Sequence, residues 1–282
     1  GYTLSLTNTA DPRKTQYFPT FDWSRIDNPK MVFPIEEHLA EVEAAEARAV
    51  EQIEGAVKRE GDDIACLIVE PIQGEGGDNH FRPEFLAELR RLADEHGFLL
   101  VFDEVQTGLG LTGSWWAWQG LGVEPDIFCF GKKTQVCGIA AGPRIDEVKD
   151  NVFQVSSRIN STWGGNLVDM VRSTRYLEII RDENLVDNAR RQGELLLAGL
   201  HDLAAAHAGS ITNVRGRGLM CAFDLPDVEI RNRALAFGRE EGVFALPCGA
   251  SSIRFRPFLD VTAEDIRDGL AALDRAIGRA LA

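Results

Sequence analysis

Three short apolar runs in the first half of the chain each stop at a polar residue or a glycine. The runs, each with the residues that follow it, are 64–69 before Glu70, 98–102 before Asp103, and 126–130 before Gly131 and Lys132. The stretches between them are long enough for crossover helices, so the pattern predicts a β-α-β-α-β unit with a buried parallel sheet. Open α/β sheets bind ligands at the edge where their parallel strands end. We therefore expect the Asp103 carboxylate and the Lys132 amine to converge on one crevice.

Other patterns in this half predict the elements around that sheet. Helical spacing of apolar residues predicts helices over 36–59 and 83–96. Alternation predicts a short strand at 3–7, and residues 136–142 are a further strand candidate. The segment 11–34 is rich in proline, aspartate and aromatic residues, which is typical of an ordered loop.

The second half of the chain has a different order of elements. The pattern predicts a long helix that ends near 181, a helix at 184–207, strands within 211–225, a helix at 229–241, strands at 243–247 and 251–256, and a helix from 262. This order is typical of a smaller α+β domain. We expect a boundary near Gly164, with part of a large α/β domain at 1–163 and a small domain at 164–282.

Charge and length exclude several classes of function. The chain has 282 residues, a formal net charge of -14 and a pI near 4.9, which disfavours nucleic acid or an anionic membrane as the main partner. No apolar stretch approaches the ~20 residues that span a bilayer, and no secretory signal pattern opens the chain. Because it begins Gly-Tyr-Thr without a methionine, we expect it to be part of something longer.

The cysteines and histidines give no sign of a metal site. None of the five cysteines forms a C-x-x-C pair, and two lie in apolar runs, so we interpret them as reduced and mostly buried thiols of a cytoplasmic protein. The five histidines are scattered, and no metal is expected.

The crevice residues suit an aldehyde cofactor with a pyridine ring. Desolvation of Lys132 would favour its neutral, nucleophilic form, which can make a Schiff base. Such a ring is an electron sink only while its nitrogen is protonated, and Asp103 could supply the anion that keeps it so. Gln106 could bond a ring oxygen, and Val105 could pack on the ring. Taken singly, Asp103 could cap a turn, Lys132 could be a surface lysine, and Lys133 could serve equally well on charge grounds.

The motifs as an ordered set resemble the class III pyridoxal-phosphate aminotransferases. The runs are EPIQGEGG at 70–77, DEVQTG at 103–108 and FGK at 130–132. The resemblance covers essentially the whole chain and implies the fold of PLP-dependent transferases of type I, with 1–163 as the C-terminal part of the large cofactor-binding domain. Within the class, the lysine 6-aminotransferase subgroup is most similar. The similarity to this subgroup rests on the runs 112–119, 131–138, 157–166 and 216–223. It also rests on two differences from the wider class, which are Leu111 after a glycine and Lys133-Thr134 after the first lysine.

The resemblance assigns roles around the cofactor. It implies that Lys132, rather than its neighbour, carries the Schiff base and that Asp103 pairs with the ring nitrogen. Gln106 would contact the ring hydroxyl and Val105 the ring face, with Glu70 in supporting hydrogen bonds.

It also assigns roles at the substrate and at a subunit interface. Thr162 resembles the residue that reaches the cofactor phosphate of a partner subunit, which implies a homodimer, and Asn160 is expected beside the substrate. Arg254 matches the arginine that grips the α-carboxylate of a dicarboxylate, and Glu75 the residue that covers it when a basic amino acid binds. Without the resemblance, Glu75 could be a polar loop residue and Arg254 a surface charge.

The implied reaction moves the terminal amino group of L-lysine to 2-oxoglutarate, giving 2-aminoadipate 6-semialdehyde and glutamate. The family's phosphate-binding loop, ring-stacking aromatic residue and one carboxylate-binding arginine would lie before Gly1, so the chain could also be an inactive fragment.

Other functions remain as alternatives. One is a class III aminotransferase acting on ornithine, 4-aminobutyrate or a diamine, and another is a cofactor-free scaffold. A nicotinamide-dependent oxidoreductase fits the glycine spacing at 108–113 but not its context, because no strand runs directly into the first glycine.

Overall fold

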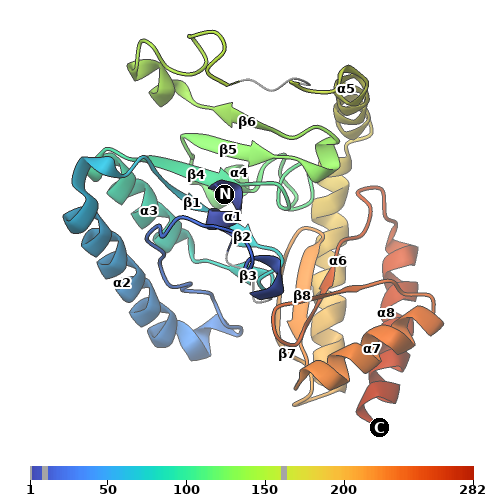
Figure 1. Ribbon diagram of the computed structural model, residues 1–282. Helices are drawn as coiled ribbons and strands as arrows, with labels where there is room; N and C mark the ends of the chain where they lie inside the picture. Colours follow the sequence, from blue (N-terminus) through green and yellow to red (C-terminus); the bar gives the residue numbers. More distant parts are fainter. Residues whose placement is uncertain (1, 8–11, 160–163) are drawn as a thin grey trace.

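The computed structural model describes residues 2–7, 12–159 and 164–282 and places a mixed sheet at the centre of the first half (Figure 1). Its strands, in spatial order, are β1 (Cys66–Val69), β4 (Leu99–Asp103), β5 (Ile127–Phe130) and β6 (Gly138–Ala141). The first three are parallel, and β6 returns antiparallel to β5. The predicted α/β class and its parallel strands are confirmed, as is the strand candidate at 136–142.

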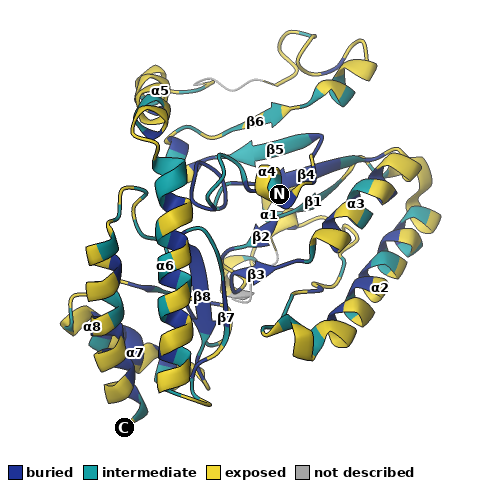
Figure 2. Cartoon of the chain, turned by 180° about the vertical axis from the view of Figure 1, so that it is seen from behind, coloured by how far each residue is buried: buried dark blue, intermediate teal, exposed yellow. Residues whose placement is uncertain are grey.

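Two long helices bury one side of this sheet. They are α2 (Ile35–Glu60) and α3 (Pro83–His96), and their apolar residues form one cluster with Leu100 and Phe102 of β4. Proline suits the first turn of α3 because an N–H is not needed there, and Gly97 ends the helix in the left-handed conformation with its N–H bonded to the Ala93 carbonyl. Figure 2 colours both helices by burial and shows buried stretches alternating with exposed ones along each.

Short elements connect these parts. They are α1 (Tyr2–Leu6), α4 (Ala117–Leu121), the paired strands β2 (Ile72–Gln73) and β3 (Asn79–His80), and 3-10 turns at Pro12–Lys14, Gly61–Asp63, Lys132–Thr134 and Pro143–Glu147. The segment predicted as a strand at 3–7 is therefore a helix, and that prediction is wrong. A strand needs a ladder partner, whereas here the Phe21 N–H donates to the Ser5 hydroxyl at 2.8 Å and Arg25 donates to the Thr7 carbonyl at 3.2 Å.

The sheet is less buried than predicted. Only β4 is buried along most of its length, whereas the residues of β1 and β5 are partly exposed. The expectation of mostly buried thiols is wrong for the same reason. Cys221 and Cys248 are buried, but Cys66 on β1 and Cys137 are exposed and Cys129 on β5 is intermediate; all five are free.

The second half forms its own sheet and core. The strands, in spatial order, are β7 (Thr212–Arg217), β8 (Met220–Asp224), β10 (Ser252–Phe255) and β9 (Leu246–Cys248), all antiparallel. The helices are α5 (Leu167–Asp182), α6 (Leu185–Ala206), α7 (Val228–Glu240) and α8 (Ala263–Leu281). Side chains from α6, α7 and α8 pack with this sheet in one apolar cluster, on the opposite side of the molecule from α2 (Figure 1). The domain boundary near Gly164 stays a prediction.

None of the helices in the described ranges is long and apolar enough to cross a membrane.

Candidate active site

Lys132 lies in a tight turn at the carboxyl end of β5. It opens the 3-10 turn Lys132–Thr134 with a φ of 48°, in the left-handed region that non-glycine residues rarely adopt and that recurs at functional sites. The preceding Gly131 leaves room for the Cys137 side chain, whose sulfur would lie 3.0 Å from a Cβ at that position. This backbone leaves Lys132 exposed at the edge where the strand ends.

The end of β4 brings Asp103 alongside. Asp103 pairs with Cys129 of β5 in the parallel register. Its Oδ1 accepts the Val105 N–H at 3.0 Å, so it does cap the turn that follows, which is the role a carboxylate here could have alone. Because only Oδ1 accepts this hydrogen bond, the other carboxylate oxygen, Oδ2, is available to a cofactor nitrogen.

Glu70, at the end of β1, completes the group. Its Oε2 accepts the Gly74 N–H at 2.9 Å. Burial raises the pKa of Glu70, the Asp103 carboxylate raises it further, and the Lys132 ammonium opposes both. The parallel registers of β1 with β4 and of β4 with β5 place the ends of all three strands at one edge of the sheet, as the sequence predicts.

Gln106 lies between this group and the second sheet. A Cβ on Gly74 would be 2.5 Å from the Gln106 side chain, so a larger residue there would push the amide out of this position. Arg254 of β10 approaches from the other side, with Nη1 at 3.4 Å from Oε1 of Gln106. Its Nε is buried and has no hydrogen-bond partner among the described residues. A buried guanidinium N–H without a partner suits an anionic ligand such as a carboxylate.

The remaining predicted residues are Glu75, Thr162 and Asn160. The Glu75 side chain is 68% exposed, and its carboxylate pairs with Lys14 at 2.5 Å rather than with Arg254. Lys14 is the main cause of the lowered pKa of Glu75, and Arg254 contributes less. Thr162 and Asn160 lie outside the described residues.

The sequence reasoning missed Glu104, which organises the loop after β4. It is 1% exposed, and its carboxylate accepts the Thr107 hydroxyl at 2.5 Å and the N–H groups of Ala117 and Trp118 at 3.0 and 2.9 Å. Burial raises its pKa against these hydrogen bonds. Its place inside the DEVQTG run is the signal that could have found it.

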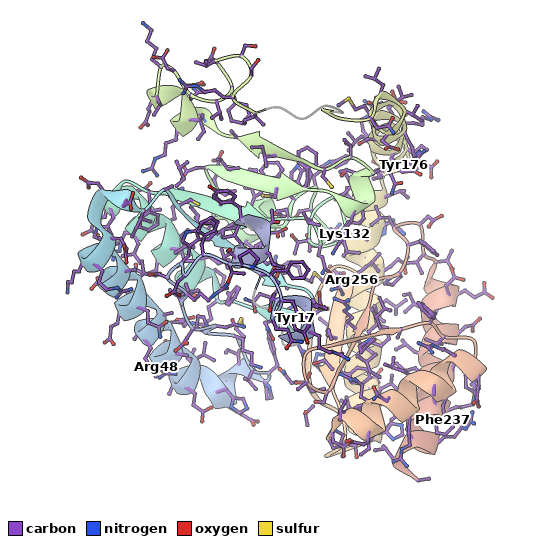
Figure 3. All side chains as sticks on the ribbon, in the orientation of Figure 1. Tyr17, Arg48, Lys132, Tyr176, Phe237 and Arg256 are labelled. Atoms are coloured by element: carbon purple, nitrogen blue, oxygen red, sulfur yellow. The ribbon has the colours of Figure 1, made fainter. Side chains whose placement is uncertain are left out.

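It also missed a buried ion pair that joins the loop at 73–80 to the second sheet. Asp78 is fully buried, and Arg256 donates to both of its oxygens, at 2.7 and 2.5 Å. Arg215 of β7 donates to the Asp78 carbonyl at 3.0 Å, and the Gly249 N–H donates to the Glu75 carbonyl at 3.0 Å. Arg256 directly follows the end of β10, two residues after Arg254. Figure 3 labels Arg256 below Lys132, between the two sheets.

The structure also separates the two adjacent lysines. Lys133 donates to the Gln106 carbonyl at 2.5 Å and is therefore already engaged, whereas Lys132 is exposed at the crevice. This arrangement favours Lys132 as the residue that meets a ligand.

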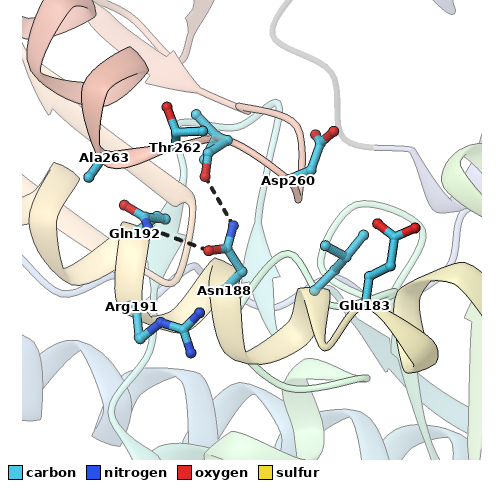
Figure 4. Close-up of a pocket in the computed structure, with 9 residues that line it drawn as sticks. Glu183, Asn188, Arg191, Gln192, Asp260, Thr262 and Ala263 are labelled. Atoms are coloured by element: carbon cyan, nitrogen blue, oxygen red, sulfur yellow. Dashed lines mark hydrogen bonds between the residues drawn. The ribbon is translucent and has the colours of Figure 1, made fainter.

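The residues present fit the pyridine ring and aldehyde of pyridoxal phosphate. They offer the Lys132 amine, the second oxygen of the Asp103 carboxylate and the Gln106 amide near one strand-end edge of the sheet. The buried Arg254 Nε, which has no hydrogen-bond partner in the part of the chain that the structure describes, could bind a carboxylate. A cavity of about 330 Å³ lies elsewhere, between the start of α6 and the loop before α8, where Asn188 donates to the Val261 carbonyl at 3.0 Å (Figure 4). None of its lining residues belongs to the crevice.

Comparisons with known proteins identify the family of the chain. The model of the aminotransferase class-III family matches residues 1–277. The chain is 53% identical over 278 residues to L-lysine-epsilon aminotransferase of Streptomyces clavuligerus, covering 98% of this chain and 61% of that protein. It is 39% identical over 246 residues to the mitochondrial 4-aminobutyrate aminotransferase of Sus scrofa, covering 86% of this chain and 48% of that protein.

Among solved structures, the lysine aminotransferase from M. tuberculosis superimposes with a TM-score of 0.96 at 53% identity, covering 99% of this chain and 64% of that one. The chain thus spans less than two thirds of these relatives. It belongs to the class III aminotransferases, a family of pyridoxal-phosphate enzymes of fold type I.

Proposed function

We propose that this chain is part of an L-lysine 6-aminotransferase, which moves the terminal amino group of L-lysine to 2-oxoglutarate and yields 2-aminoadipate 6-semialdehyde and glutamate. The observation that carries the proposal is the meeting of Lys132, Asp103 and Glu70 at the ends of three parallel strands. The 53% identity to lysine aminotransferases supports the choice of amino donor.

Bound pyridoxal phosphate would supply an electron sink for the carbon next to the transferred nitrogen. Lys132 would hold the cofactor covalently and, once displaced by substrate, would carry a proton between substrate and cofactor carbons as general base and acid. The Asp103 carboxylate would hold the proton on the pyridine nitrogen. Gln106 would bond the ring hydroxyl, Val105 would pack against the ring, and Glu70 would brace the Gly74 loop through the contact described above.

Substrate contacts come from the second sheet and its loop. The Arg254 guanidinium would bind the α-carboxylate of 2-oxoglutarate by two parallel hydrogen bonds. Glu75 would swing from Lys14 to cover Arg254 when L-lysine, which presents an amine at that end, is bound. Thr162 would reach the cofactor phosphate of a partner subunit in a homodimer, with Asn160 beside the substrate. Five free cysteines support a cytoplasmic location.

The test is covalent capture of the cofactor. After incubation with pyridoxal phosphate, reduction by borohydride and proteolysis, we expect the adduct on the Lys132 peptide and none in Lys132→Ala. The matched control is Lys149→Met, an exposed lysine outside the crevice that should leave capture unchanged. An adduct on Lys133 in the unchanged chain would contradict the assignment, and no adduct would mean that this chain alone does not hold the cofactor.

The alternative amino donor is 4-aminobutyrate. It is supported by the 39% identity between this chain and the 4-aminobutyrate aminotransferase of Sus scrofa. The two donors are distinguished by mixing the cofactor-loaded protein with L-lysine, ornithine or 4-aminobutyrate and measuring how fast the cofactor absorbance band decays in a single turnover. Fastest decay with L-lysine supports the proposal.

A further inference from the structure

Lys133 joins two turns that the sheet brings side by side. Its amine, on the turn after β5, donates to the carbonyl oxygen of Gln106, on the turn after β4, at 2.5 Å. The Gln106 side chain in turn crosses Gly74 and meets Arg254 at 3.4 Å. Gln106 is therefore held at its backbone by one lysine and at its amide by one arginine.

The turn that carries Lys133 is itself fixed. The Thr134 side chain is buried, and its hydroxyl donates to the Val136 carbonyl at 2.7 Å. The Thr134 N–H bonds the Gly131 carbonyl at 3.3 Å, which closes the turn around Lys132. A lysine anchored on this turn therefore sets the distance between the Lys132 turn and Gln106.

The surroundings of the Lys133 amine disfavour its charged form. Burial lowers the pKa of Lys133 to about 7, and the cations of Arg256 and Lys132 lower it as well, whereas the Glu104 carboxylate opposes them. Arg256 is itself paired to Asp78. An apolar residue here would avoid the desolvation of the amine, so the contribution that is specific to a lysine at this position is its hydrogen bond to Gln106.

We propose that Lys133 is a positioning residue, which fixes the Gln106 turn relative to Lys132 so that the Gln106 amide meets the hydroxyl of the cofactor ring. The contact with Gln106 is independent of the proposed function, whereas the consequence for the ring hydroxyl rests on it. Lys133 touches neither substrate nor cofactor in this role.

The first experiment tests the contact without cofactor. Hydrogen exchange of the peptide spanning 104–108 should be about 5-fold faster in Lys133→Met than in the unchanged chain, the effect of one lost hydrogen bond. The control, Lys149→Met, should leave that peptide unchanged. If Lys133→Met does not fold, Lys133→Gln, which keeps a neutral donor on a shorter stem, replaces it and should show a smaller acceleration. Equal exchange in all chains would overturn the proposal.

The second experiment tests the consequence at the ring. The affinity for pyridoxal phosphate is compared with that for 3-deoxypyridoxal phosphate, which lacks only the ring hydroxyl. Lys133→Met should reduce the preference for the hydroxyl-bearing cofactor about 3- to 5-fold and leave the affinity for the deoxy compound nearly unchanged. An equal loss for both compounds would mean a general structural role and overturn the positioning role. If the unchanged chain binds neither, the proposed function fails for this chain, and the exchange result alone decides on the contact.

Discussion

Neighbouring residues of one type have different environments in this chain because the backbone turns between them. Lys132 has a φ of 48° and is exposed at the strand-end crevice, whereas Lys133 directs its amine to the Gln106 carbonyl. The two side chains are chemically identical, so no property of either residue alone distinguishes them. The distinction depends on the tight turn that begins at Gly131.

His80 is a second residue whose environment decides its chemistry. It is 7% exposed, its Nε2 has no hydrogen-bond partner among the described residues, and burial lowers its pKa to about 3, helped by the cations of Arg215, Arg217 and Arg256. The unfolded chain has an ordinary histidine with a pKa near 6.5. The neutral form is therefore the one that the fold requires.

This gives a stability that depends on pH. Between about pH 6.5 and 3 the unfolded chain binds a proton at His80 that the folded chain does not. The stability that the fold gains from a neutral His80 is therefore complete above pH 6.5 and is lost as the pH falls towards 3. We expect the free energy of unfolding to fall more steeply in this window for the unchanged chain than for His80→Gln, by up to about 1.4 kcal/mol per pH unit. Urea denaturation at several pH values measures it. Parallel curves for the two chains would contradict the prediction.

At the scale of elements, helix ends and close contacts decide where each segment lies. The capping box of Thr262 and Asp265 begins α8, and Asp227 caps α7 through the Ile230 N–H at 2.7 Å. By contrast, α6 is positioned by a missing side chain. A Cβ on Gly193 would lie 2.2 Å from the backbone of Gly218 in the turn between β7 and β8.

Two glycine-to-alanine changes in helices should therefore have opposite effects. Gly193→Ala forces α6 away from the β7–β8 turn and should lower the free energy of unfolding by about 2 kcal/mol. Gly269→Ala in α8 meets no atom within 4 Å and should raise it by about 0.5–1 kcal/mol, because alanine loses less backbone entropy in a helix. Thermal and urea denaturation of both variants test this. A destabilised Gly269→Ala would show that helix propensity does not control that position.

At the scale of the molecule, the loop at 73–80 connects the two sheets. It begins beside Glu70 at the first sheet and is bound by Arg215 and Arg256 of the second through Asp78. The crevice therefore depends on both sheets. Arg254, which lies on the second sheet, approaches Gln106 across the contact between the sheets that this loop helps to form.

Removing the charge of the buried Asp78 should destabilise the fold far more than removing the charge of an exposed aspartate. Asp78→Asn keeps the shape but leaves the Arg256 guanidinium without its anion, and should lower the free energy of unfolding by about 3 kcal/mol. Asp187→Asn, which removes an exposed carboxylate paired with Arg190 and Arg191, should change it far less. Urea denaturation compares the two. Equal losses would mean that the buried pair contributes no more than a surface one.

Much of the fold could be predicted because its signals are local. Apolar runs that end at Glu70, Asp103 and Lys132 marked the parallel strands, and Pro83 and Gly97 marked the ends of α3. The failures have a common physical cause. The helix at Tyr2–Leu6 and the exposure of Cys66 depend on which elements lie beside them, and alternation within a segment carries no such information.

The candidate site shows the same division. Strand-end residues were predicted together and lie together, because the carboxyl ends of parallel strands share one edge. Glu104, Asp78 and the inward direction of Lys133 were missed, because each depends on a hydrogen bond to a residue distant in the sequence or to a turn of unusual geometry. The roles of Thr162 and Asn160 stay predictions.

The partly exposed outer strands of the first sheet have a consequence for how copies of this chain behave in solution. β1 and β6 bound the sheet, and each has one side on which no strand of the described chain pairs with it. Unpaired edge N–H and C=O groups are docking points for a strand of another molecule, which is a route to aggregation. The formal net charge of -14 opposes such encounters by long-range repulsion. Electrostatic repulsion therefore protects these edges from pairing with another copy, and added salt, which shortens the range of the repulsion, should increase self-association.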